Sequence, residues 1–283
     1  MGLRKRLLTG IVASGLLLGG AKDSSGDNWK VDRRDAAVFA ANVGFNAAIG
    51  CIASKKNNKG CLEGAKKGAS AGAISYGAKK AVAANPDYAW PSKLIMGVST
   101  SMMDNLINDD PLFSSYMLRL GPVSLDYKFR SRRLRPTVNV DAIANIVYAE
   151  ARGYDFDPGK SLRYGVVYYT HNHPGERFAG YSIGSALTIN EGTTRSVPKD
   201  ILISHELVHM FQIDNGHVLG KLIFRSLPEK VHDKAIRLRN KSFTNIDELT
   251  GNGFIVAPFH LTLNHDSRPI ELEAMALTDY KAR

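Results

Sequence analysis

The segment His205-Glu206-Leu207-Val208-His209 determines how this 283-residue chain is interpreted. It lies in a helix-favouring run between Ile201 and Ile213. Residues four positions apart lie on the same face of a helix, so the two imidazoles can bind one ion together. This spacing, with a glutamate after the first histidine, is typical of zinc sites in which the glutamate handles the proton of a bound water. We predict that His205 and His209 bind one zinc ion and that Glu206 is the general base.

Local signals predict where this helix begins and ends. Ser196 is a suitable N-cap, and Pro198 falls in the first turn, where its missing N–H costs nothing. Asn215-Gly216 is typical of a C-terminal stop, because both residues readily adopt the left-handed conformation. Most other residues in the run are apolar, which predicts a buried helix. Buried polar side chains need compensation, and a metal ion provides it.

Two histidines leave a catalytic zinc site one protein ligand short. Gln212 and Asn215 do not continue the pattern H-E-x-x-H-x-x-G-x-x-H, which would place a third histidine just downstream. The better candidate is Glu271, in a predicted closing helix over 271–283 with Ser267 as its N-cap. His217 is a weaker candidate from the loop expected after the helix stop.

H-E-L-V-H at 205–209, followed by a second helix carrying E-L-E-A at 271–274, resembles the gluzincin class of zinc metallopeptidases. The resemblance covers these two helices. It implies a zincin-like α+β fold, a single zinc ion held by His205, His209 and Glu271, and hydrolysis of peptide bonds. It also implies that Glu273 is either a partner of the ligands or a substitute ligand.

The preceding stretch fits the same α+β architecture. The predicted elements are strands over 124–129, 136–140, 163–170 and 181–190, and helices over 94–107 and 141–152. In zincins an edge strand beside the metal binds the substrate as an added strand. The hypothesis for this chain is that Ser182–Asn190 is that strand.

Other polar residues could contribute to a site, and the sequence does not choose among them. His260, His265 and Tyr280 are available as donors to a developing oxyanion, although a structural or surface role is the commoner one for such residues. His171 and His173 have a spacing that can bind metal, but the following Pro and Gly favour a turn instead.

The N-terminus predicts export. Arg4-Lys5-Arg6 is a basic segment, Leu7–Gly20 is mildly apolar, and cleavage after Ala21 is consistent with the small residues there. The alternative is an uncleaved N-terminal helix. The protein is therefore expected in the periplasm or cell envelope.

An Ala- and Gly-rich region follows, and two interpretations compete for it. Ala36–Ala53 carries no charge, and glycines recur at about four-residue intervals over 60–77, which lets helices approach closely. Lysines surround both stretches, which favours a hairpin associated with anionic lipid without spanning the membrane. The alternative is a soluble helical hairpin that packs on the enzyme domain. In an exported protein Cys51 and Cys61 can form a disulfide across the turn.

These observations predict a signal peptide over 1–21, a helical region over 22–110 that associates with a membrane, and a zincin-like catalytic domain over 111–283. The net charge of +10 is not accompanied by a nucleic-acid-binding motif, so a membrane surface and a peptide substrate are the expected partners. The principal alternative is a membrane-associated structural protein that keeps a zincin-like fold without proteolysis. A zinc hydrolase acting on a non-peptide envelope bond is a third reading.

Overall fold

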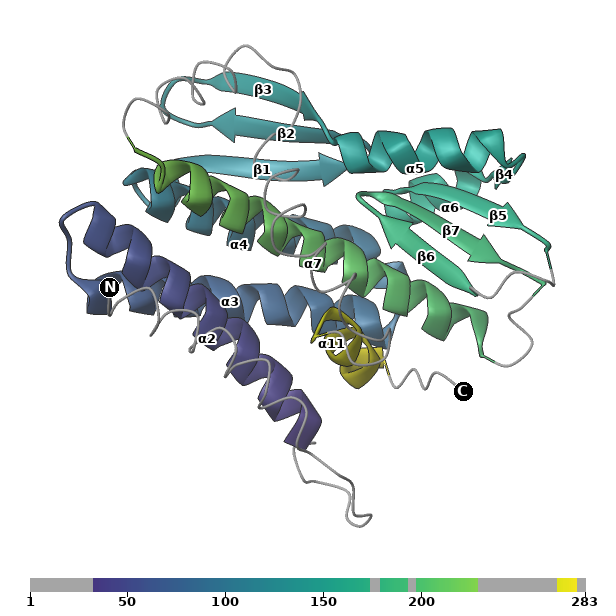
Figure 1. Cartoon of the computed structure of the whole chain (residues 1–283), viewed down its shortest axis with the longest axis horizontal. Coiled ribbons are helices and arrows are strands. Elements are labelled where there is room, and N and C mark those ends of the chain that lie inside the picture. Colours follow the sequence, from purple (N-terminus) through teal and green to yellow (C-terminus); the bar gives the residue numbers. More distant parts are fainter. Residues whose placement is uncertain (1–32, 174–178, 193–196, 229–268, 279–283) are drawn as a thin grey trace.

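The computed structural model describes residues 33–173, 179–192, 197–228 and 269–278. Helices and strands are both present, so the α+β class is confirmed. The predicted signal peptide, Ser196 and Ser267 lie outside the described residues, as do His260, His265 and Tyr280. Long helices form the lower layer of the molecule in Figure 1, and two small sheets lie above them.

The first two helices form the expected hairpin. They are α2 (Arg33–Lys56) and α3 (Cys61–Ala84), and a disulfide joins Cys51 to Cys61 across their turn. A Cβ atom added at Gly64, Gly68 or Gly72 would collide with the backbone of α2. These three glycines therefore serve close helix packing, as predicted, whereas a Cβ at Gly60 or Gly77, at the two ends of the series, would meet no atom of α2 within 4 Å.

Two more helices complete this layer. The 3-10 turn η1 (Pro86–Tyr88) leads into α4 (Ala89–Asn108), and the long helix α7 (Lys199–Arg225) crosses α3 and α4. The short helix α11 (Pro269–Thr278) packs against α7, α3 and α2. Among the described helices, α2 alone is long and apolar enough to cross a membrane, a property that a core helix can share.

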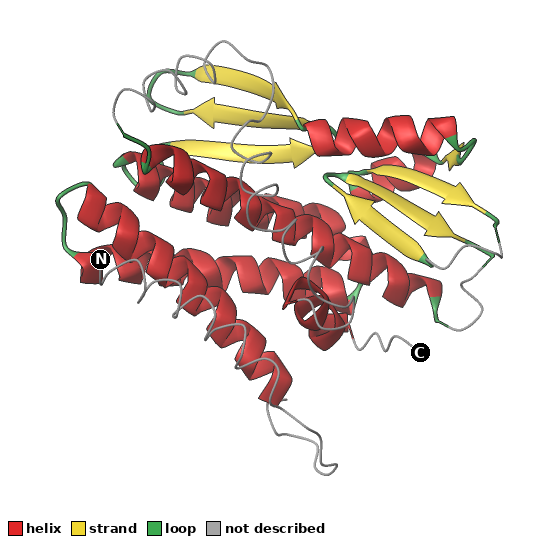
Figure 2. Cartoon of the chain, in the orientation of Figure 1, coloured by secondary structure: helices red, strands yellow, loops and turns green. Residues whose placement is uncertain are grey.

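The first sheet is an antiparallel meander. It contains β1 (Ser115–Leu120), β2 (Val123–Lys128) and β3 (Arg133–Val138), with β1 lying against α4. Helix α5 (Val140–Ala151) follows directly and leads to the second sheet (Figure 2).

The second sheet has the strand order β4-β5-β7-β6. Its strands are β4 (Asp155–Phe156), β5 (Val167–His171), β6 (Gly180–Ile183) and β7 (Ala186–Asn190), and helix α6 (Pro158–Tyr164) connects the first two. Only the β5–β7 pair is parallel. Helix α7 contacts β6 and β7, so the sheet covers the N-terminal half of that helix.

Two predicted strands were placed incorrectly. The stretch 181–190 is a hairpin because Gly184 adopts a left-handed conformation, φ +61°, where an added Cβ would lie 2.5 Å from the Ala142 nitrogen. Of the proposed edge strand Ser182–Asn190, β7 is interior and buried, and only β6 lies at the edge. The predicted strand over 163–170 begins later, because Gly165 ends α6 in a left-handed cap.

The predicted helix stop at Asn215-Gly216 is also wrong, since α7 continues to Arg225. Its second half is buried through Val218 and Leu222, which pack with α2 and α4 residues. This tertiary burial outweighs the local preference of Asn-Gly for a stop.

One hydrophobic cluster draws on both sides of the predicted boundary near residue 110. It joins Val38, Ala78 and Met96 to Leu207 and Ala274. The boundary stays a prediction, but the helical hairpin and the segment with the H-E-x-x-H motif share this core.

Candidate metal centre

Helices α7 and α11 bring His205, His209 and Glu271 together. Their ligand atoms all lie within 4.8 Å of one another. The Glu271 Oε2 atom is 3.3 Å from His205 Nε2 and 3.2 Å from His209 Nε2, and the two Nε2 atoms are 3.0 Å apart. In the described part of the chain this is the one group with metal-ligand geometry. The three residues predicted as ligands therefore converge on one point.

The local sequence explains this convergence. His205 and His209 are one helical turn apart, so both rings project from the same face of α7. Leu207 and Val208, between them, are fully buried and fix the rotation of the helix against the core. Ala274 on α11 is also fully buried in that core, which holds Glu271 one turn earlier against α7. Both Glu271 and His205 are buried, with exposed fractions of 5% and 3%.

Hydrogen bonds at the opposite ring nitrogens orient both imidazoles. The amide of Gln212 donates to Glu273 and to the Ile270 carbonyl, so its oxygen accepts from His209 Nδ1 at 2.7 Å. The Thr278 hydroxyl donates to the Ala274 carbonyl, leaving its oxygen to accept from His205 Nδ1 at 3.5 Å. In this tautomer both Nε2 lone pairs face Glu271, as metal binding requires.

Glu273 is a partner of the ligand shell rather than a member of the ligand group. Besides accepting from Gln212 at 2.8 Å, it accepts from Lys79 at 2.8 Å and from Asn42 at 2.7 Å. Lys79 is fully buried and also donates to Asn42. Burial alone would raise the pKa of Glu273, but the Lys79 ammonium and these donors lower it. Glu273 therefore remains a carboxylate and anchors Gln212.

The electrostatics of the group favour a cation. Burial would lower the pKa of His209, but two effects outweigh it and raise this pKa to about 9: the hydrogen bond that Nε2 donates to Glu271 once the ring is protonated, and the charge of Glu206. The buried carboxylates of Glu206 and Glu271 thus stabilise a positive charge at the His209 ring. A zinc ion fits the same field, and a set of two histidines and one glutamate is a known catalytic zinc shell.

Glu206 lies beside the ligands beneath the sheet edge. Its side chain is largely buried, and an added Cβ at Gly180 on β6 would lie 3.4 Å from Glu206 Cγ. A methyl group there would be in ordinary van der Waals contact with the glutamate, so the edge strand lies directly against Glu206. The sequence prediction of a general base is consistent with this placement.

The other candidate residues lie elsewhere. His217 pairs with Asp104 at 3.1 Å on the second half of α7. His171 stacks on Tyr154, with ring centroids 4.1 Å apart, and lies 5.3 Å from the His173 ring. Neither His217 nor the pair His171 and His173 belongs to a metal-ligand group among the described residues.

Sequence reasoning missed Gln212, Lys79 and Asn42 as parts of this centre. The sequence holds a weak signal for Asn42 and Gln212. Each is a polar residue inside an otherwise small or apolar helical segment, where a buried polar side chain requires a partner. No protein-family model, curated protein sequence or solved structure matches this chain.

Proposed function

We propose that this protein is an exported zinc metallopeptidase that hydrolyses peptide bonds in the cell envelope. The observation that carries the proposal is the convergence of His205, His209 and Glu271, with Glu206 buried beside them. A structural zinc site is typically closed by four protein ligands, whereas a catalytic site has three and keeps a position for water. Within the described residues three ligands group together, which matches the second arrangement.

The residues of the chain have distinct parts in this reaction. A bound zinc ion supplies a water of lowered pKa and polarises the substrate carbonyl. Glu206 takes the proton of the attacking water at its carboxylate and delivers it to the leaving amine. Gln212 and Thr278 hold the imidazoles of His209 and His205 in the ligating tautomer.

The edge strand β6 is the proposed substrate platform. Within the described residues it pairs with β7 on one side only, so its outer backbone groups can bind an extended peptide. Gly180 on this strand lies close to Glu206, which would bring a paired peptide near the general base. The revised assignment keeps the edge-strand hypothesis but moves it from 182–190 to Gly180–Ile183.

The test compares zinc content and peptide hydrolysis in the wild type and in Glu206→Gln. We expect the variant to bind one zinc ion per chain and to lose hydrolysis of unfolded protein by about 10²- to 10⁴-fold. Glu191→Gln is the matched control, since Glu191 is exposed and pairs with Lys199. Full activity in Glu206→Gln would overturn the mechanism. A zinc-bound wild type without hydrolysis would support the structural-protein alternative.

A further inference from the structure

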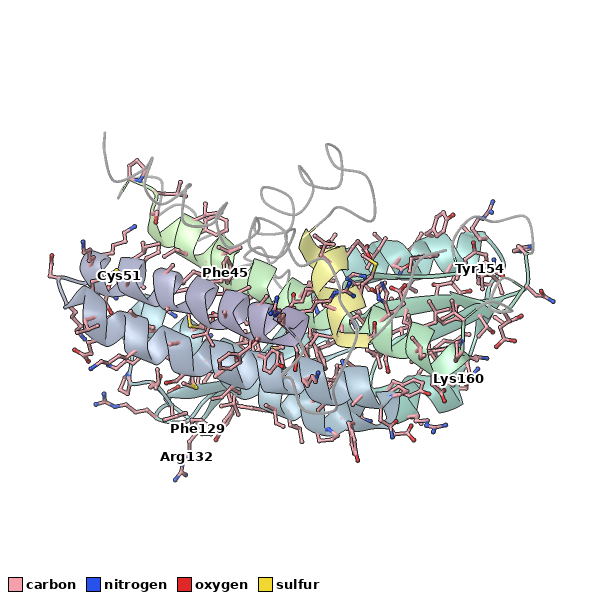
Figure 3. The ribbon with its side chains drawn as sticks, turned by 90° about the horizontal axis from the view of Figure 1, so that it is seen from below. Phe45, Cys51, Phe129, Arg132, Tyr154 and Lys160 are labelled. Atoms are coloured by element: carbon pink, nitrogen blue, oxygen red, sulfur yellow. A yellow bond between two sulfur atoms is a disulfide. The ribbon has the colours of Figure 1, made fainter. Side chains whose placement is uncertain are left out.

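The turn between β2 and β3 carries an unusual combination of side chains. The pair Lys128–Arg133 closes this hairpin, and Arg132 adopts a left-handed conformation in the turn, φ +51°. Phe129 and Arg132 project away from the body of the molecule in Figure 3. The residues around this turn form what we call the basic tip, namely Phe113, Phe129, Arg130, Arg132, Arg133 and Leu134.

Three members of the basic tip are large apolar residues in solvent. Their exposed fractions are 67% for Phe113, 51% for Phe129 and 55% for Leu134. The Phe129 N–H donates to the Ser114 carbonyl at 3.0 Å, which holds the turn containing Phe113 beside the hairpin. Single exposed apolar residues are common, but three gathered at one end of the hairpin are typical of a surface that meets an apolar phase.

Among the described residues, the three arginines of the tip have no counter-charge of their own. Arg130, Arg132 and Arg133 are exposed, and in the part of the chain that the structure describes none of them has an ion pair or hydrogen bond through its side chain. Other arginines do have partners, such as Arg119 with Asp214 at 2.6 Å and Arg163 with Asp87 at 2.7 Å. The positive charge of the tip is therefore available to an external anion.

We propose that the basic tip docks on an anionic lipid surface. Guanidinium groups bind phosphate through paired charge-assisted hydrogen bonds, and the interleaved phenylalanines and leucine can enter the interface between headgroups and acyl chains. Leu134 has no ring to stack on a base, which favours lipid over nucleic acid. This inference is independent of the proposed metal.

Docking in this manner leaves the candidate centre accessible. In Figure 1 the β2–β3 turn lies at the left-hand end of the first sheet, whereas β6 and the start of α7 lie in the right-hand half. The tip would therefore hold the protein at the surface while the edge strand β6 remains open to substrate.

The experiment measures binding of the full chain to vesicles of phosphatidylcholine with and without phosphatidylglycerol. Removing one interfacial arginine weakens binding about fivefold, so Arg130→Gln/Arg132→Gln is expected to weaken it about 30-fold at low salt. Arg152→Gln/Arg163→Gln is the matched control, because it removes two exposed arginines at the end of α5 and on α6, outside both the tip and the helical hairpin. The apolar segment 7–20 is present in every variant, so its contribution is common to all.

A second variant reports insertion directly. Phe129→Trp should show additional fluorescence that shifts to shorter wavelength with anionic vesicles and stays unshifted with neutral vesicles. Equal loss of binding in the tip and control variants, or no shift at position 129, would overturn the proposal. Tip-dependent binding to single-stranded DNA without binding to vesicles would also overturn it and assign the tip to nucleic acid.

Discussion

Lys79 is the residue through which the helical hairpin reaches the candidate metal centre. Its ammonium is fully buried and pairs with Glu273. Glu273 accepts a hydrogen bond from Gln212, and Gln212 orients the His209 ring. Removing one member of a buried pair leaves the other charge uncompensated. Mutating a residue that hydrogen-bonds a metal ligand typically weakens metal binding 10- to 100-fold.

We therefore expect Lys79→Met to weaken zinc binding by about 10- to 100-fold. Competition with a chromophoric chelator measures this affinity. Lys80→Met is the control, because the neighbouring lysine is exposed and pairs with Asp35 instead. The double variant Lys79→Met/Glu273→Gln removes both charges and should recover part of the affinity. Identical affinities for Lys79→Met and Lys80→Met would show that the hairpin does not support the centre.

At the residue level, spacing predicted the two histidines and the resemblance to zinc metallopeptidases predicted Glu271, whereas the residues that support these ligands were not predictable. His205 and His209 are one helical turn apart, and Glu271 lies in a second recognisable helix. The bonds from Glu273 to Lys79 and Asn42 span 194 and 231 residues of sequence. No local pattern encodes a partner at that distance.

At the level of elements, the glycines of α3 divide into two kinds. Gly68 faces the Asn46 carbonyl of α2, where a methyl group would collide with backbone. A methyl group at Gly77 would meet no atom of another described element within 4 Å. The first glycine is required by packing, and the second only weakens its helix.

The two glycines should respond to alanine in opposite directions. Gly68→Ala forces α2 and α3 apart and is expected to lower the free energy of unfolding by about 1–3 kcal/mol. Gly77→Ala should raise it by about 0.5–1 kcal/mol, since alanine favours a helix. Urea denaturation of both variants gives these values. Equal effects would mean that the hairpin is not packed closely in solution.

Local signals predicted the types of several elements better than their limits. The helix over 141–152 and the strand over 124–129 agree with α5 and β2 within a residue or so. Helix α7 passes the predicted stop at Asn215-Gly216 because Val218 and Leu222 are buried beyond it. The hairpin of β6 and β7 reads as one strand until Gly184 is known to have positive φ.

At the level of the whole molecule, a buried charge cluster ties α4 to α7. Asp104 lies 2.6 Å from Lys221 and 3.1 Å from His217, both beyond the predicted helix stop. Burial alone would raise the pKa of Asp104, but the charges and hydrogen bonds of Lys221 and His217 hold it well below the ordinary range. The cluster therefore stabilises the fold while Asp104 is ionised.

This depressed pKa predicts a specific dependence of stability on pH. An aspartate titrates near pH 3.9 in the unfolded chain, so its contribution is complete above about pH 5 and is lost as the pH falls below that range. Asp104→Asn leaves Lys221 buried without a carboxylate, and we expect it to lower the free energy of unfolding at pH 7 by about 3–5 kcal/mol. The difference from wild type should shrink between pH 5 and pH 2, as measured by urea denaturation at each pH.

Asp109→Asn is the matched control for this measurement. Asp109 caps the same helix but pairs with Lys59 at the surface, where an ion pair contributes less than about 1 kcal/mol. Its substitution should therefore change the unfolding free energy little at any pH. If Asp104→Asn showed the same small, pH-independent effect, the cluster could not be what joins α4 to the second half of α7, and the extension of α7 would have to rest on Val218 and Leu222 alone.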